Sequence, residues 1–343
     1  MMDKLFFMND YGEGAHPLVL KRLAETNLEH TCGYGLDAYS LQAAALIRSL
    51  CGQPGAAVHM MTGGTSANMI ALSAFMRPYE AVIAAPTGHI NVHETGAVEG
   101  SGHKVLPAAS HEGKVLPEGV RAVVQAHPDE HMVRPRVLYI SQPTETGTVY
   151  SLDELRALRA VCDACGLILF VDGARLGSAL TCAEATATLS DLAALADAFY
   201  IGGTKNGLYF GEAMVIVNPT LQPDFRYMIK NRGGMLAKGR LCGVMFLAAL
   251  ENGDYFEWAR HANAMADIIR AGITRAGIPF FQKTTTNQVF PIVKRAQEQA
   301  LAEQVAFERW AEVDDDHVAI RFVTSWATDE ADARRLASLM EAL

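Results

Sequence analysis

The N-terminus of the sequence lacks a long apolar run. Its apolar stretch, Leu5–Met8, is far too short for the core of a signal peptide or for a membrane span. The sequence also lacks a run of lysine and arginine that could follow a phosphate backbone, and its net charge is −9. We therefore expect a cytoplasmic protein with neither a nucleic-acid partner nor a membrane partner.

Cysteine is sparse, with 6 residues scattered along 343 positions. Reduced thiols are the natural expectation for such a chain. Cys162 and Cys165 form a C-x-x-C pair, but no second pair follows, so we predict that both pack in a core. No metal site is predicted from the cysteines.

The composition is that of a globular protein with a sizeable core, since 50% of the residues are hydrophobic and 20% are charged. The length suggests about two domains. Short apolar runs in the central region predict buried strands separated by helices. Ser151–Cys165 has helical spacing, with Ser151 as N-cap and Glu154 completing a capping box. The predicted strands are Arg136–Ser141, Leu167–Asp172, Ala198–Gly202 and Ala213–Asn218.

This alternation predicts an α/β fold with a mostly parallel sheet. The pattern changes after residue 250, where a long helix, Tyr255–Ala276, precedes short strands and a final helix from Thr328. The two strands are expected near Gln288–Val293 and Ala319–Thr324. We therefore predict a smaller α+β C-terminal domain. The expected division is a large cofactor-binding domain of residues 12–245 and a small domain of residues 1–11 and 246–343.

Three features fall where the carboxyl ends of strands meet, the place where ligands bind in open α/β sheets. The first is Met61–Asn68 (MTGGTSAN), which leads into the helical run Met69–Met76. Its backbone N–H groups and hydroxyls suit a phosphate, although an ordinary glycine turn with a Thr/Ser cap is the simpler interpretation of this loop alone. The loop matches neither the Walker motif nor the dinucleotide fingerprint.

The second feature is Asp172, which follows a fully apolar strand within Val171–Arg175 (VDGAR). A carboxylate there is costly to bury unless it meets a cation such as a protonated pyridine nitrogen, although a helix cap is the simpler interpretation of Asp172 alone. The third is Lys205 in Gly202–Gly207 (GGTKNG), where partial desolvation would lower its pKa toward that of a nucleophile. The order of the three features predicts pyridoxal phosphate as the cofactor.

These motifs resemble those of the threonine aldolase and β-eliminating lyase family of fold-type I pyridoxal-phosphate enzymes, and the likeness runs along most of the chain. The D-G-A-R and small-small-lysine motifs at this separation are quite specific for that family. The phenylserine aldolase branch looks closest, because Gln142–Tyr150 (QPTETGTVY) is similar to its segment before the same helix. Other matching segments are Asn9-Asp10, Gly33–Asp37 (GYGLD), Gly88–Gly96 (GHINVHETG) and Ile320–Ser325 (IRFVTS).

The resemblance implies roles for residues around the cofactor. Lys205 would bind it covalently, Asp172 would pair with the pyridine nitrogen, and Arg175 would lie beside the phenolic oxygen. His89 would stack on the pyridine ring; if the segment is helical, it could instead bind a metal together with His93, an alternative that we weigh less. The phosphate would be held by Gly64, Thr65 and Thr204.

The resemblance also implies residues around the substrate. Arg321 would bind the α-carboxylate, for which a planar guanidinium is well suited, and Asn9 stands where the family often has serine. The family implies a homodimer or homotetramer in which Tyr34 would complete the site of a neighbouring subunit. One further cation of that subunit would be Lys230, Lys238 or Arg240.

One position departs from the family pattern. Threonine aldolases commonly carry a histidine that meets the substrate hydroxyl in the loop matching Thr144–Gly147, whereas this sequence has Glu145. The predicted reaction is cleavage of a β-hydroxy-α-amino acid to glycine and an aldehyde, with His89, Glu145 or a water as the base. Threonine, allo-threonine and phenylserine types of substrate stay open. The alternatives are a β-eliminating lyase or aminotransferase on the same scaffold and, in another class, a non-enzymatic scaffold or sugar-nucleotide binder.

Overall fold

The apolar runs of the central region form the strands of a 7-stranded sheet with the order β2-β10-β9-β8-β7-β3-β4. The computed structural model describes residues 4–343. Strands β9, β8, β7, β3 and β4 pair in parallel, whereas β10 pairs antiparallel with both β2 and β9. The strands of this sheet are β2 (Ala57–Met61), β3 (Glu80–Ala84), β4 (Lys104–Pro107), β7 (Arg134–Ser141), β8 (Ile168–Asp172), β9 (Ala198–Gly202) and β10 (Glu212–Ile216).

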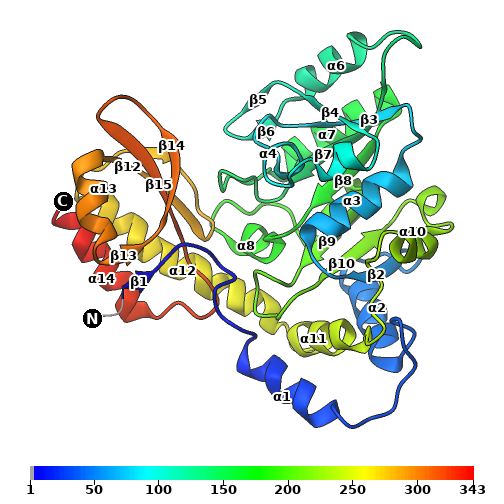
Figure 1. The fold of residues 1–343 in the computed structure, drawn as a ribbon, viewed down its shortest axis with the longest axis horizontal. Coiled ribbons are helices and arrows are strands. Elements are labelled where there is room, and N and C mark those ends of the chain that lie inside the picture. The colour runs from blue at the N-terminus through cyan, green and yellow to red at the C-terminus, as the bar shows by residue number, and fades with distance from the viewer. Residues whose placement is uncertain (1–3) are drawn as a thin grey trace.

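Helices cover both faces of this sheet, as its continuously apolar strands require (Figure 1). One face packs against α1 (Pro17–Thr26), α2 (Ala38–Leu50), α6 (Pro117–Gln125), α7 (Leu152–Cys165), α9 (Leu189–Leu195) and α11 (Arg240–Leu250). The other packs against α3 (Gly64–Phe75), α5 (Ala97–Gly100) and α10 (Phe225–Asn231). Shorter elements of this unit are α4 (His89–Val92), β5 (Ser110–His111), β6 (Lys114–Val115), α8 (Leu176–Thr181) and a 3-10 turn, Pro219–Leu221.

The predicted capping box at the start of α7 is confirmed. The Ser151 hydroxyl accepts from the N–H of Glu154, and the Glu154 carboxylate accepts from the N–H of Ser151 at 2.7 Å. The helix expected over Met69–Met76 instead begins at Gly64, because Gly63 serves as its N-cap. The glycine-threonine motif is therefore the first turn of α3 and not a loop before it.

A smaller unit follows, with a 4-stranded antiparallel sheet of order β11-β12-β15-β14. Helices α12 (Asp254–Arg275) and α14 (Glu330–Glu341) pack against each other and share the core of this unit, so the predicted long helix and final helix are both present. The other elements are β11 (Phe280–Gln282), β12 (Gln288–Lys294), α13 (Arg295–Ala302), β13 (Val305–Ala306), β14 (Glu308–Glu312) and β15 (His317–Val323). The fold is thus the α/β architecture with a small α+β unit that the sequence predicts.

The N-terminal segment belongs to the smaller unit before it crosses to the larger one. Strand β1 (Leu5–Phe6) pairs in parallel with β13, and Figure 1 shows the blue segment passing from there to α1. Residue 245 lies within α11, and core membership changes only within α12, between Trp258 and Met265. The division into two separate domains stays a prediction.

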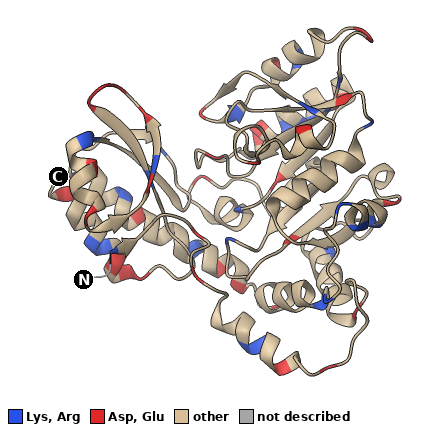
Figure 2. Ribbon diagram, in the orientation of Figure 1, with Lys and Arg blue, Asp and Glu red and all other residues tan. Residues whose placement is uncertain are grey.

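Charged residues of both signs are interspersed over the two units (Figure 2). All 6 cysteines are free, and Cys162 lies in the core of the larger unit. Within residues 4–343, no helix has the length and apolar character needed to span a membrane.

Candidate active site

The predicted site residues from several strand ends surround one pocket. Its volume is about 270 Å³, and it adjoins a smaller one of about 50 Å³ that reaches Gly64, Asp172 and Tyr200. Both pockets share His89, Glu145, Arg175 and Lys205. The larger pocket is also lined by Tyr11, His93, Glu308, Trp310 and Arg321.

Lys205 lies in the turn that follows β9, where the sheet edge and the two pockets meet. Burial and the neighbouring Arg175 guanidinium lower the pKa of Lys205, while the carboxylates of Asp10 and Asp172 act in the opposite direction. Within residues 4–343, its ammonium has neither a hydrogen-bond partner nor an ion-pair partner inside 4.0 Å. The lysine is therefore held in the pocket with its nitrogen available.

Asp172 ends β8 and is 4% exposed. It accepts hydrogen bonds from the Tyr139 hydroxyl at 2.5 Å, the Asn68 amide at 3.1 Å and the Ala174 N–H at 2.9 Å. Burial alone would raise the pKa of Asp172, but His89 and these hydrogen bonds hold that pKa below its ordinary value. Asp172 is thus a buried carboxylate that stays ionised, although no cation among residues 4–343 forms a direct ion pair with it.

His89 opens α4, and its ring is held by a buried carboxylate. Its Nδ1 lies 2.8 Å from Oε1 of Glu94, which also accepts from the Asn68 amide at 2.8 Å. Asn68 therefore joins Glu94 to Asp172. An ionised carboxylate only accepts, so the proton of this hydrogen bond lies on Nδ1 of His89.

Glu145 lies in the loop after β7 and faces both pockets. Its Oε1 accepts from the Ser141 hydroxyl at 2.6 Å and from the His89 backbone N–H at 2.8 Å. Its Oε2 has no partner among residues 4–343. Burial raises the pKa of Glu145, and the Asp172 charge adds to the shift against the opposing Ser141 hydrogen bond.

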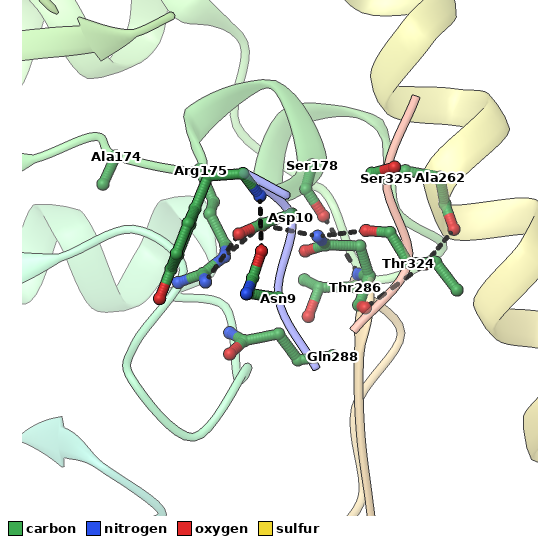
Figure 3. Close-up of polar contacts among 12 residues, drawn as sticks. Asn9, Asp10, Ala174, Arg175, Ser178, Ala262, Thr286, Gln288, Thr324 and Ser325 are labelled. Atoms are coloured by element: carbon green, nitrogen blue, oxygen red, sulfur yellow. Dashed lines mark hydrogen bonds and ion pairs between the residues drawn. The ribbon is translucent and has the colours of Figure 1, made fainter. Parts of the chain in front are cut away.

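Arg175 is paired with the N-terminal segment. Its Nε and Nη2 donate to the two carboxylate oxygens of Asp10 at 2.6 and 3.0 Å (Figure 3). Its remaining nitrogen, Nη1, has no partner within residues 4–343. The neighbouring Asn9 accepts from the N–H of Tyr11 at 3.1 Å, and it is Tyr11 rather than Asn9 that lines the larger pocket.

Arg321 comes from β15 of the smaller unit and is already partnered. Its Nη1 donates to the Gln288 side chain at 3.0 Å, and its Nη2 forms an ion pair with Glu308. Its guanidinium also lies over the Trp310 ring, 5.0 Å from the centroid. His93 lies between the two sets of residues, with its ring centroid 5.6 Å from that of His89 and 6.3 Å from that of Trp310.

The first turn of α3 is open to a ligand. The N–H groups of Gly64, Thr65 and Ser66 have no backbone partner within residues 4–343, and the Thr65 side chain is exposed. The buried Tyr200 hydroxyl lies beside Gly64, 3.3 Å from where a Cβ at that glycine would stand. Free N–H groups at one end and an ionised carboxylate lacking a cation at the other fit a phosphate and a protonated ring nitrogen, the two ends of pyridoxal phosphate.

The Thr204 hydroxyl, unlike the N–H groups in the first turn of α3, is already hydrogen-bonded. It donates to the Glu212 carboxylate at 2.8 Å and accepts from the Gly211 N–H at 3.0 Å. Burial raises the pKa of Glu212 to about 8, with Lys205 and the Thr204 hydrogen bond acting against that rise. The predicted phosphate contact of Thr204 stays a prediction.

Tyr34 does not reach the Lys205 pocket of its own chain. It is 45% exposed in a separate pocket near Met235, and the Lys230 ammonium lies 4.8 Å from its ring centroid. Arg240 donates to the carbonyl of Glu29 at 2.8 Å. Within residues 4–343 no cluster of three or more metal-ligating side chains was found.

Several site residues were missed by sequence reasoning. Tyr139 and Asn68 contact Asp172 across 33 and 104 positions, whereas Glu94 and Glu212 contact His89 and Thr204 only 5 and 8 positions away. The dipeptide Asn287-Gln288 belongs to no recognisable motif. Asp10 lies within a matched segment, Asn9-Asp10, but that segment gives it no role of its own. The missed residues are Asp10, Asn68, Glu94, Tyr139, Glu212, Asn287, Gln288, Glu308 and Trp310.

Comparison with known proteins agrees with this geometry. Residues 14–296 match the family described as beta-eliminating lyase. The chain is 34% identical over 342 residues to a low specificity L-threonine aldolase of a Pseudomonas species, covering 98% of this chain and 97% of that protein. A second relative, from Pseudomonas aeruginosa, is 32% identical and carries the same description, with 96% of this chain and 95% of that protein covered.

Solved structures give the same result. A threonine aldolase of Leishmania major superposes with a TM-score of 0.97 at 42% identity, covering 98% of each chain. An aspartate aminotransferase of Thermus thermophilus has a TM-score of 0.73 at 16% identity, covering 99% of this chain and 91% of that one, and shows the shared fold alone. The chain belongs to the threonine aldolase and β-eliminating lyase family and is a pyridoxal-phosphate-dependent aldehyde-lyase with a type I fold.

Proposed function

We propose that the protein cleaves a β-hydroxy-α-amino acid to glycine and an aldehyde, with threonine, allo-threonine and phenylserine as the substrate types. The observation that carries this proposal is the Glu145 carboxylate, which lines the same pocket as Lys205 and Arg321 and whose Oε2 has no partner among residues 4–343. The names of the relatives support threonine as one substrate. The aromatic side chains of His93 and Trp310 in the pocket wall support an aryl substituent as well.

Each residue of the pocket has a part in this reaction. Lys205, with its lowered pKa, would bind the cofactor and then yield to the substrate amine. Arg321 would hold the α-carboxylate, for which Glu308 must give way. Pyridoxal phosphate, when bound, takes up the electron pair released as the Cα–Cβ bond breaks. Asp172, which stays ionised, would hold the proton on the ring nitrogen during that step.

Glu145 is the base that we propose for the β-hydroxyl proton. The His89 ring is hydrogen-bonded through Nδ1 to Glu94, and the His89 backbone N–H holds one oxygen of Glu145, which leaves the other without a partner among residues 4–343. A carboxylate with a raised pKa holds a proton better than an ordinary one, as this step requires. Stacking on the cofactor ring remains the proposed part of His89.

Product analysis tests the proposed function. Purified protein loaded with pyridoxal phosphate should release glycine and the matching aldehyde from L-threonine, L-allo-threonine or phenylserine. Release of ammonia and a 2-oxo acid, or amino transfer to an added 2-oxo acid, without glycine would instead assign the chain to β-elimination or transamination. Lys205→Ala is the negative control in each assay.

We also propose a homodimer or homotetramer with shared active sites. Tyr34, Leu36 and Leu41 are large apolar side chains that are 45%, 55% and 57% exposed around one pocket, as expected for a contact with a second copy. Lys230, which lies over Tyr34, would bring a cation to the neighbouring site. Sedimentation measures the assembly, and mixing inactive Lys205→Ala and Tyr34→Ala proteins should restore activity only if sites are shared between subunits.

A further inference from the structure

The buried carboxylate of Asp10 connects three parts of the molecule. It is 1% exposed, it comes from the N-terminal segment, and it accepts both hydrogen bonds of the Arg175 pair in the larger unit. Its Oδ2 also accepts from the amide of Asn287, the residue just before β12, at 2.9 Å. Burial raises the pKa of Asp10, but the charge and hydrogen bonds of Arg175, together with the Lys205 charge and the Asn287 hydrogen bond, hold that pKa below its ordinary value. The carboxylate is therefore the charge partner of Arg175.

The orientation of Asn287 is fixed from several sides. Its amide nitrogen donates to Asp10 and to the Thr324 carbonyl, each at 2.9 Å, while its backbone N–H donates to the Ser178 hydroxyl at 3.1 Å. Its Oδ1 is buried with no hydrogen-bond partner in the part of the chain that the structure describes. Two acceptors therefore converge on one NH2 group, a requirement that an amide meets and a carboxylate cannot.

The next residue along the chain serves the other arginine. Gln288 is fully buried, and its Oε1 accepts from Nη1 of Arg321 at 3.0 Å. Asn287 thus holds the Asp10–Arg175 pair, and Gln288 holds Arg321. Both arginines line the larger pocket, and Nη1 of Arg175 has no partner among residues 4–343.

We propose that Asp10 and the adjacent residues Asn287 and Gln288 form a positioning unit that orients the two arginines of the pocket. Asp10 aims Arg175 at the cofactor, Gln288 aims Arg321 at the substrate carboxylate, and Asn287 connects the two. This inference rests on the roles given to Arg175 and Arg321 in the proposed function. None of the three residues needs to touch the reacting atoms for the unit to act.

Three single variants separate the parts of the unit. Asp10→Asn keeps the shape of the side chain but removes the charge from Arg175, and it should raise the cofactor dissociation constant by about tenfold or more. Gln288→Met fills the same space without the hydrogen bond and should raise KM while kcat and cofactor affinity stay near wild type. Asn287→Asp places two carboxylates in contact and should raise both the cofactor dissociation constant and KM. Cofactor affinity is read from a titration followed by visible absorption.

The exchange variant Asp10→Asn/Asn287→Asp distinguishes positioning from mere structural support. It restores an amide-to-carboxylate hydrogen bond between the two positions but leaves Arg175 without its carboxylate. We expect the unfolding temperature to recover part of the loss seen in Asn287→Asp, while the cofactor dissociation constant stays raised. Asn218→Asp is the matched control, since the Asn218 amide donates to the Asp197 carboxylate at 2.8 Å away from the pocket.

The outcomes decide the inference separately from the proposed function. If the cofactor affinity of the exchange variant recovers together with its unfolding temperature, the three residues have only a structural role. Cofactor affinity and KM within about twofold of wild type in the folded single variants would overturn the inference as well. If Asn287→Asp does not fold, Asp10→Asn and Gln288→Met still give the two separate readouts. Cofactor titrations and unfolding measurements do not depend on aldehyde release. Failure of the proposed reaction would appear in product assays of the wild-type protein and would leave these two measurements unaffected.

Discussion

The backbone N–H of His89 donates to Oε1 of Glu145 at 2.8 Å, so the residue that would stack on the cofactor also aims the carboxylate that faces the substrate. Ser141 donates to the same oxygen at 2.6 Å. Together the two donors hold Oε1 and leave Oε2 without a partner among residues 4–343, in a side chain that lines the pocket. A base placed in this way needs no movement of its own before it receives a proton.

Replacement of Glu145 by glutamine should affect the chemical step and spare cofactor binding. Glutamine can still accept from Ser141 and His89, but it cannot take up the proton of the β-hydroxyl. We expect kcat for retro-aldol cleavage to fall by about 100-fold or more, with little change in the visible absorption of the bound cofactor. Ser141→Ala is the companion variant, because it removes one fixing hydrogen bond and should lower kcat by less.

The pH dependence of kcat should show the titration of the Glu145 carboxylate. A base works only when deprotonated, so activity should fall as the pH drops through the pKa of Glu145, which burial raises above the ordinary value of 4.5. This acidic limb should be absent from the residual activity of Glu145→Gln. An unchanged acidic limb in that variant would assign the limb to another group and remove Glu145 from the role of base.

Glu145→His addresses the substrate preference. Histidine is the residue that threonine aldolases commonly carry in this loop, so the change should shift kcat/KM from aryl substrates toward threonine. The measurement is the ratio of kcat/KM for phenylserine and L-threonine in the variant and in wild type. A ratio that does not move would show that other residues of the pocket wall, with Trp310 as the first candidate, set the preference.

The position of Lys205 and Asp172 at one sheet edge could be predicted from the sequence, since both follow apolar strands that are one crossover apart. Carboxyl ends of parallel strands meet at a common edge, and this rule required no knowledge of side chains. Glu212 could not be found in the same way. It begins a strand, and the apolar pattern of β10 gives no sign that this strand runs antiparallel and brings its first residue to that edge.

The residues that contact the predicted site residues could not be predicted from the sequence for a different reason. Asn287 and Asp10 are 277 positions apart and Asn68 and Glu94 are 26 apart, so their contacts exist only after the chain has folded. Arg321 was predicted from a matched segment, whereas its partner Glu308 lies on a neighbouring strand with a mixed pattern of exposure. Motifs reveal residues that bind ligands, and the residues that orient them are distributed by the topology.

Glu308→Gln should strengthen substrate binding. The Glu308 carboxylate pairs with Nη2 of Arg321, where the substrate carboxylate is proposed to bind, and so competes with it. Removal of the competing charge should lower KM by about threefold with kcat nearly unchanged. Glu312→Gln is the matched control on the same strand, because Glu312 pairs with Arg295 and Arg309 instead. An equal drop in KM in both variants would point to a general change of charge and not to competition at Arg321.

Glu212→Gln should alter how the stability of the cofactor-free protein depends on pH. Glutamic acid in an unfolded chain titrates near about 4.3, whereas the pKa of folded Glu212 is raised to about 8, with burial as the main cause. Between these two values the folded state holds one more proton than the unfolded state. The contribution of Glu212 to stability is therefore fully present below the lower value and is lost as the pH rises through the higher one.

Wild-type protein should accordingly lose free energy of unfolding between about pH 5 and about pH 8, and the variant should lose less, by on the order of 4 kcal/mol. Denaturant unfolding at several pH values measures both slopes. Glu130→Gln, a change at an exposed carboxylate, should leave the wild-type slope intact. Parallel slopes in wild type and Glu212→Gln would mean that Glu212 is already ionised across this range, with the Lys205 ammonium as its counter-charge.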